Sequence, residues 1–249
     1  MRYLLIYLLF LSGCVSVGIP PEYRRIDMKT QSFTIATWQK ITNPSAPYRV
    51  YIEGDGHAFN AHGHPSQDPT PKGTLVRELA FSDKNDNVIY LSRPCQYVKN
   101  ELCQQKYWTS ARFAPDVIDA EYQALEQVTQ HKPTILIGFS GGAQVAGLLA
   151  VTKPELNVKK IITIAGNLDH RAWVGFHNLA PLNESLNLAD YYTDFIKIPQ
   201  IHYVGEDDKV IFPHLVQQFI KNNASVILVP HATHDKGWER IYKKIQSEN

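Results

Sequence analysis

Short runs of apolar and β-branched residues recur along this 249-residue chain, and they constrain its fold more than any other feature. Several are apolar at nearly every position, which is typical of strands buried on both faces of a sheet. The expected strands are residues 33–41, 49–52, 87–91, 134–137, 160–164, 200–204 and 225–229. Apolar residues recur at helical spacing in 115–130, 142–152, 213–222 and 236–246. Strands that alternate with helices predict an α/β fold with a mainly parallel central sheet flanked by helices.

Composition excludes several classes of protein. With 44% hydrophobic and 20% charged residues, the chain can bury a sizeable core and is not expected to be disordered. The 25 Lys and Arg residues nearly balance the 24 Asp and Glu residues, so no positively charged surface for nucleic acid is expected.

The aromatic and polar stretch 167–197 interrupts the alternation of strands and helices and is interpreted as a small insertion over the carboxyl edge of the sheet. The composition does not specify an oligomeric state.

The N-terminus has the pattern of an export signal. Arg2 precedes an apolar run over 4–11, which is too short to span a bilayer as a helix and ends in Leu-Ser-Gly-Cys at 11–14. This ending resembles the lipobox of bacterial lipoproteins, and the alternative is an ordinary secretory signal. The resemblance implies that residues 1–13 are a signal peptide and that Cys14 carries a lipid. Because Val15 is not aspartate, we expect an anchor in the outer membrane, facing the periplasm.

The residues after the lipidation site predict a tether, and the remaining cysteines predict a bridge. Residues 14–32 are mostly polar and contain two prolines, which suits a linker to a single domain over 33–249. Export to an oxidising compartment favours a disulfide between Cys95 and Cys103, with two buried free thiols as the alternative.

A glycine-rich turn follows the apolar run 134–137. Gly138-Phe139-Ser140-Gly141-Gly142 matches G-x-S-x-G and leads directly into the helix expected from 142. In this context a sharp strand-to-helix turn presents the serine hydroxyl at the edge of the sheet. The N–H groups that begin the helix favour a developing oxyanion. Ser140 is therefore the candidate nucleophile.

Two later segments supply candidates for the acid and the base that a serine nucleophile needs. Asp207 and Asp208 follow the strand expected at 200–204, whereas His231 and His234 follow the last expected strand. On the residues alone, both aspartates and both histidines stay candidates.

With these motifs in this order, residues from about 45 to 245 resemble the α/β-hydrolase superfamily. In that superfamily the acid stands three residues after a strand-ending glycine, which implies Asp208, with Asp207 as the alternative. The histidine precedes the terminal helix, which implies His234, with His231 as the alternative.

The resemblance also implies an oxyanion hole. One donor would be the backbone N–H of Gly141, and the second would come from Asp55 or Gly56 in the turn after strand 49–52. Glu53 stands where many relatives have a histidine, so the geometry of this turn is expected to differ. Three segments, at 53–56, 93–97 and 166–170, also resemble those of a group of exported bacterial α/β-hydrolases.

The expected activity is hydrolysis of carboxylic esters through an acyl-enzyme at the bacterial cell envelope. The substrate would be a small-molecule or lipid ester. A peptidase or amidase with the same triad is the alternative enzyme, and a non-catalytic envelope lipoprotein is the alternative outside enzymes. The acyl-enzyme mechanism implies no cofactor or metal. His57, His62 and His64 lie close together, but they lack the spacing of a metal site and are interpreted as part of a solvent-facing loop.

Overall fold

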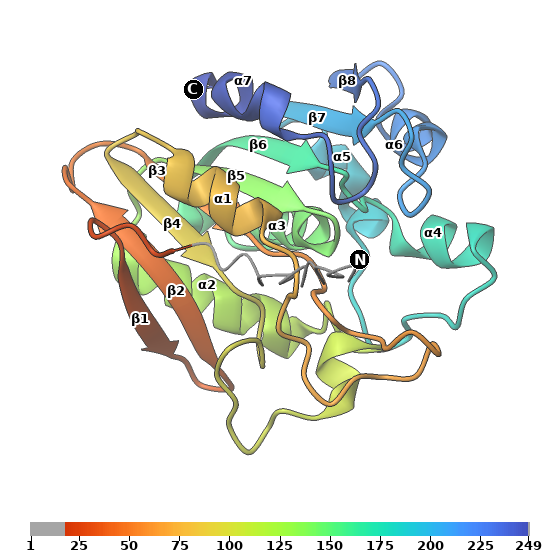
Figure 1. The fold of residues 1–249 in the computed structure, drawn as a ribbon, viewed down its shortest axis with the longest axis horizontal. Coiled ribbons are helices and arrows are strands. Elements are labelled where there is room, and N and C mark those ends of the chain that lie inside the picture. The colour runs from red at the N-terminus through yellow and green to blue at the C-terminus, as the bar shows by residue number, and fades with distance from the viewer. Residues whose placement is uncertain (1–17, 249) are drawn as a thin grey trace, which may run out of the picture.

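The computed structural model describes residues 18–248 and shows one eight-stranded sheet in the order β1-β2-β4-β3-β5-β6-β7-β8 (Figure 1). The strands are β1 (Arg24–Lys29), β2 (Thr34–Ile41), β3 (Tyr48–Ile52), β4 (Asn87–Leu91), β5 (Thr134–Phe139), β6 (Val158–Ile164), β7 (Gln200–Gly205) and β8 (Ser225–Val229). β2 pairs antiparallel with both β1 and β4, and all other neighbours are parallel. The predicted α/β fold with a mainly parallel sheet is confirmed.

Helices cover both faces of the sheet (Figure 1). The α-helices are α1 (Leu75–Ser82), α2 (Pro115–Thr129), α3 (Gly141–Thr152), α4 (His170–Phe176), α5 (Tyr192–Phe195), α6 (Pro213–Ile220) and α7 (Tyr242–Ser247), with short 3₁₀ turns at Gln105–Trp108, Pro154–Leu156, Leu188–Tyr191 and Glu239–Ile241. Apolar residues of α2, α3 and α6 share one core, while those of α1 and α7 share the other. Within β5, Leu136 packs into the first core and Ile135 and Ile137 into the second. The strand is continuously apolar because both of its faces are buried.

The prediction of a tether over 14–32 is wrong for residues 24–29, which form β1. This strand pairs with β2 along its whole length, and the preceding Tyr23 is buried with its hydroxyl donating to the Ala80 carbonyl at 2.6 Å. β1 is an exposed edge strand with only two apolar residues, Ile26 and Met28, so its sequence lacks the continuous apolar run that marks the central strands. The predicted signal peptide and lipidation site at Cys14 lie outside the described residues. Within residues 18–248, no helix has the length and apolarity needed to cross a membrane.

The insertion predicted at 167–197 is the connection between β6 and β7. Its first part, up to Leu182, borders the cavity described below. Leu188 and Phe195 are instead fully buried in the core that contains α3.

Two helices differ from the sequence-based expectations. The sequence does not predict α1, and the helix expected at 236–246 is a 3₁₀ turn followed by the short α7.

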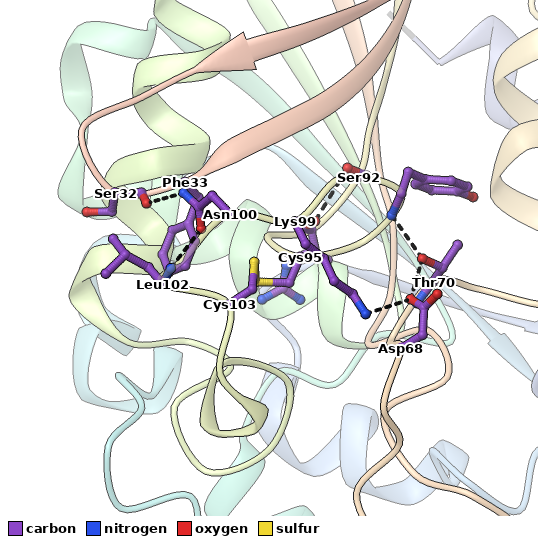
Figure 2. The surroundings of a disulfide bond; sticks show 12 residues. Ser32, Phe33, Asp68, Thr70, Ser92, Cys95, Lys99, Asn100, Leu102 and Cys103 are labelled. Carbon is purple, nitrogen blue, oxygen red and sulfur yellow. Dashed lines mark hydrogen bonds and ion pairs between the residues drawn. A yellow bond between two sulfur atoms is a disulfide. The ribbon is translucent and has the colours of Figure 1, made fainter.

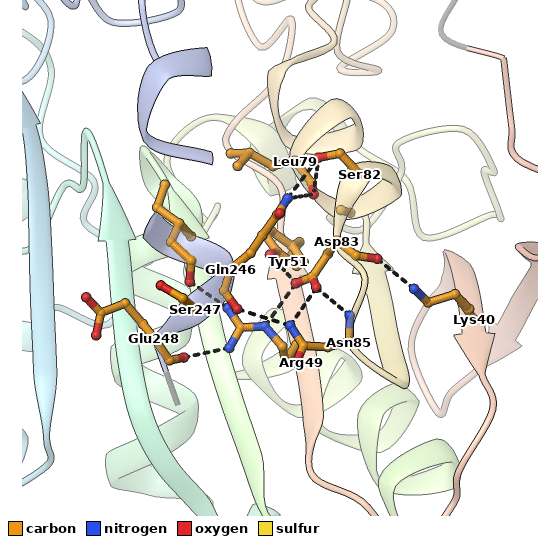
Figure 3. Close-up of polar contacts among 12 residues, drawn as sticks. Lys40, Arg49, Tyr51, Leu79, Ser82, Asp83, Asn85, Gln246, Ser247 and Glu248 are labelled. Carbon is orange, nitrogen blue, oxygen red and sulfur yellow. Dashed lines mark hydrogen bonds and ion pairs between the residues drawn. The ribbon is translucent and has the colours of Figure 1, made fainter. Parts of the chain in front are cut away.

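A buried ion pair at the start of β3 holds the C-terminal helix against the sheet (Figure 3). Arg49 on β3 donates from Nε to Oδ2 of Asp83 at 2.9 Å, and the Tyr51 hydroxyl donates to the same oxygen at 2.6 Å. Arg49 also donates to the carbonyls of Ile245 at 2.7 Å and Glu248 at 2.6 Å. Burial, together with the Asp83 carboxylate, raises the pKa of Tyr51 well above its usual value. One guanidinium therefore connects β3, the end of α1 and the C-terminal helix.

Replacing Asp83 with alanine should destabilise the protein by about 3–5 kcal/mol, because it leaves the Arg49 guanidinium buried without its carboxylate. Urea unfolding followed by tryptophan fluorescence measures the change. The matched control is Asp27→Ala, which removes the partner of Arg25 in an exposed pair of the same 2.9 Å length. We expect this control to cost less than about 1 kcal/mol, and equal losses in the two variants would contradict the prediction.

Candidate active site

Ser140 occupies a strained turn between β5 and α3. Its backbone has φ 51° and ψ −121°, a conformation that costs a non-glycine residue on the order of 1–3 kcal/mol. The Ser140 N–H donates to the Ile164 carbonyl at 3.0 Å, and its own carbonyl accepts from the N–H groups of Ala143 at 3.1 Å and Asn167 at 3.0 Å. Neighbouring β6 and the loop after it therefore hold the turn in place.

The glycines at positions 138 and 142 are required by packing. A Cβ atom at position 138 would lie 2.4 Å from the Gly142 carbonyl oxygen, and one at position 142 would lie 2.4 Å from the Ile52 carbonyl oxygen. Both distances are too short for any side chain. The start of α3 consequently rests directly on the backbone at the end of β3.

His234 links Ser140 to Asp208. The His234 Nε2 atom lies 3.0 Å from Ser140 Oγ, and Nδ1 lies 2.9 Å from Asp208 Oδ2. Asp208 is 2% exposed, and its Oδ1 accepts hydrogen bonds from the N–H groups of Val210 at 2.8 Å and Ile211 at 2.9 Å. These backbone donors orient the carboxylate toward the imidazole.

The alternative acid and base lie away from this arrangement. Asp207 and His231 are both exposed, and their closest charged atoms, Asp207 Oδ2 and His231 Nδ1, are 3.8 Å apart. Neither residue lines the cavity around Ser140. The structure thus brings together Ser140, His234 and Asp208, the combination that the superfamily resemblance implied.

The turn predicted to supply the second oxyanion donor lies against the serine. A Cβ atom on Gly54 would be 3.3 Å from Ser140 Cβ, and Gly56 has φ +63°. Among residues 18–248, the backbone N–H groups of Asp55 and Gly141 donate no hydrogen bond to the protein. Both groups are therefore available to a ligand, and their role as oxyanion donors stays a prediction.

Glu53 holds this turn through two hydrogen bonds. Its Oε1 accepts a hydrogen bond from the Gly54 N–H at 3.0 Å, and its Oε2 accepts one from the Tyr90 hydroxyl at 2.6 Å. Burial raises the pKa of the Glu53 carboxyl, while these hydrogen bonds act in the opposite direction.

A loop closed by a disulfide also contacts this turn; Figure 2 shows the disulfide and its surroundings. Cys95 and Cys103 form a disulfide with their Cα atoms 5.6 Å apart. Next to Cys95, the Gln96 side chain donates to the Gly54 carbonyl at 3.1 Å. The Tyr97 N–H donates to Thr70 Oγ1 at 2.9 Å, which attaches the loop to the segment before α1. The predicted bridge is therefore present, and it supports the candidate site.

Sequence reasoning missed the contribution of Arg112. Its guanidinium borders the cavity and pairs with the Asp55 carboxylate, with Arg112 Nη1 2.5 Å from Asp55 Oδ2. Arg93 Nη1 lies 3.5 Å from Asp55 Oδ1. No sequence signal connects these residues, because Asp55 and Arg112 are 57 positions apart in the chain and come from different loops.

Ser140 and His234 open onto a cavity of about 1340 Å³. Much of its wall is apolar, formed by α1, α4 and the loops after α4 and β7, including Leu75, Val76, Trp173, Leu182 and Ile211. Charged side chains at its border include Lys72, Arg112 and Lys236. Within the described part of the chain, no group of three His, Cys, Asp or Glu residues is arranged to hold a metal ion.

The fold and the serine turn define the class of the protein, an α/β-hydrolase-fold serine hydrolase. The model of the family described as "Serine hydrolase (FSH1)" matches residues 76–235, well over half of the chain. The chain belongs to this family.

Solved structures share the fold at low sequence identity. An esterase from Pyrococcus furiosus has a TM-score of 0.61 at 16% identity, with 91% of this chain and 88% of that chain covered. A serine hydrolase from Cycloclasticus zankles has a TM-score of 0.61 at 13% identity, covering 90% and 94%. An α/β serine hydrolase without a lid from Xanthomonas campestris has a TM-score of 0.54 at 12% identity, covering 91% of both chains. Among curated proteins, no sequence matches significantly.

Replacing Gly142 with alanine should destabilise the protein by about 1–3 kcal/mol, because the new methyl group would displace α3 from the backbone of β3. Thermal unfolding measures this loss. The control is Gly175→Ala in α4, where nothing lies within 4 Å of the new Cβ and the helix gains propensity. A Gly142→Ala protein as stable as this control would show that the close packing at the turn is not required.

Proposed function

We propose that the protein hydrolyses carboxylic esters through a Ser140–His234–Asp208 triad and an acyl-enzyme intermediate. The observation that carries the proposal is the pair of hydrogen bonds made by His234, 3.0 Å to Ser140 Oγ and 2.9 Å to Asp208 Oδ2. A serine hydroxyl is a weak nucleophile until an adjacent base removes its proton, and the imidazole is placed to do so.

The proposed reaction has two halves. His234 takes the Ser140 proton as Oγ attacks the ester carbonyl carbon, and the protonated imidazole then gives that proton to the departing alcohol. In the second half His234 removes a proton from water, which attacks the acyl-enzyme and releases the carboxylic acid. Asp208 stays ionised, keeps Nδ1 protonated and stabilises the imidazolium. The N–H groups of Gly141 and Asp55 would stabilise the negative carbonyl oxygen in both halves.

The cavity supports a substrate with a sizeable apolar group. Its volume of about 1340 Å³ exceeds the roughly 300–1,000 Å³ of many small-molecule sites. The apolar wall formed by Trp173, Leu182 and Ile211 would favour an acyl or alcohol group larger than acetyl. Similarity to the fold of an esterase is consistent with this substrate class.

Ser140→Ala should abolish ester hydrolysis and labelling by a fluorophosphonate. Asp208→Asn should lower kcat by about 10⁴-fold, because the His234 imidazole loses the carboxylate that orients it. The assay uses p-nitrophenyl esters of increasing acyl length and the corresponding anilides. We expect kcat/KM to rise from the acetyl ester to longer acyl chains and to be far lower for the anilides.

Asp207→Asn is the matched control, since it makes the same exchange of a carboxylate oxygen for an amide nitrogen at the neighbouring exposed residue. It should keep wild-type kinetics. Undiminished turnover by the Ser140→Ala protein, or equal losses in the two aspartate variants, would refute the proposed triad.

We also propose that the enzyme acts at the cell envelope, anchored by a lipid on Cys14 and facing the periplasm from the outer membrane. The Leu-Ser-Gly-Cys sequence at 11–14 supports this location, and a disulfide suits an oxidising compartment. In bacterial cells fed an alkyne fatty acid, the wild-type protein should become labelled and fractionate with membranes, whereas Cys14→Ser should not be labelled. Equal labelling of both proteins would refute the anchor.

A further inference from the structure

Two arginines that take no part in the proposed proton transfers meet at Asp55, in the turn after β3. Arg112 and Arg93 both contact the Asp55 carboxylate, through Arg112 Nη1 to Oδ2 at 2.5 Å and Arg93 Nη1 to Oδ1 at 3.5 Å. The arginine side chains are 5–6% exposed, and that of Asp55 is 22% exposed. Asp55 and Arg112 line the cavity and Arg93 lies behind Asp55, so three charged groups meet in a largely buried place where charge is costly unless it is paired.

The Asp55 carboxylate lies next to the proposed oxyanion hole. A Cβ atom on Gly141 would be 2.2 Å from Asp55 Oδ1, so this oxygen packs directly against the Cα of the residue that follows Ser140. The backbone N–H groups of these same two residues are the proposed oxyanion donors. An unpaired carboxylate here would repel the negative charge that develops on the substrate carbonyl oxygen.

Both arginines are held by other groups and are therefore fixed in place. Arg112 donates from Nε to the Thr109 carbonyl at 2.8 Å, and its guanidinium lies over the Phe59 ring. Arg93 pairs with Glu121 at 2.6 Å and also donates to the Arg112 carbonyl. Burial raises the pKa of Glu121 to about 7, and the Arg93 charge acts in the opposite direction.

We propose that Arg112, assisted by Arg93, is a positioning residue for the oxyanion hole. Its guanidinium neutralises the Asp55 carboxylate, so that the carboxylate does not repel the negative oxygen of the tetrahedral intermediate. The same ion pair holds the Asp55 side chain and so keeps the 54–56 turn against Ser140. This inference rests on the proposed serine hydrolase function.

The test compares Arg112→Met, Asp55→Asn and the double variant. Arg112→Met should lower kcat on a p-nitrophenyl ester, and the rate of fluorophosphonate labelling, by about 10- to 100-fold, with KM changed less than about twofold. Asp55→Asn removes the charge but keeps the side-chain shape, so its loss should be smaller. The double variant should be faster than Arg112→Met and should approach the rate of Asp55→Asn.

Recovery in the double variant is the readout that a merely structural role would not produce, because a second substitution in a damaged site ordinarily adds to the damage. Arg112→Lys keeps the charge and should retain more activity than Arg112→Met. Arg25→Met, in an exposed pair on β1, is the control and should keep the wild-type rate. Thermal unfolding verifies that each variant is folded, and if Arg112→Met does not fold, Arg112→Gln, which also removes the charge, replaces it in both the single and the double variant.

Three outcomes would overturn the inference. Wild-type rates for Arg112→Met would show that the charge of Asp55 needs no cancellation. A double variant no faster than Arg112→Met, with the wild type labelled normally, would mean that Arg112 acts on the substrate itself or on folding. Wild-type protein that neither labels nor hydrolyses any ester would refute the proposed function and this inference with it.

Discussion

The strained turn at Ser140 is the constraint around which the rest of the site is built. Its backbone conformation is tolerated because α3 begins directly against the end of β3, which is possible only when position 142 lacks a side chain. The Ile164 carbonyl of β6 accepts the Ser140 N–H. The turn thus fixes the relative positions of β3, β5, β6 and α3, and the groups that serve the serine are placed relative to it.

Parallel pairing explains why distant residues meet at this turn. β3, β5, β6, β7 and β8 are neighbours that run in the same direction, so the loops after them all emerge at one edge of the sheet. Ser140 and His234 are 94 residues apart in the sequence, yet their side-chain atoms are 3.0 Å apart. The loop after β7 adds Asp208, whose carboxylate is oriented by two backbone N–H groups before it reaches the histidine.

Buried charge lies at both ends of β3 and serves a different purpose at each. At the start of the strand, Arg49 and Asp83 join the C-terminus to the sheet, far from the serine. Beyond its end, Asp55 is paired with two arginines beside the groups proposed to bind an oxyanion. A buried ion pair contributes little net stability by itself, but removing one partner is costly. The two groups of buried charges therefore hold the segments at the two ends of β3 in place.

Local sequence predicts the α/β class, most strand positions and the serine turn, because a continuous apolar run indicates a strand buried on both faces and a glycine-rich turn indicates a tight local backbone. It does not indicate β1, an exposed strand without a continuous apolar run, and the residues alone do not distinguish Asp207 from Asp208 or His231 from His234. Only the tertiary structure placed the exposed pair away from the cavity and the buried pair beside Ser140, and only it joined Arg93 and Arg112 to Asp55. The physical reason is that these contacts connect loops far apart in the chain, and their distances depend on how the strands align and pack.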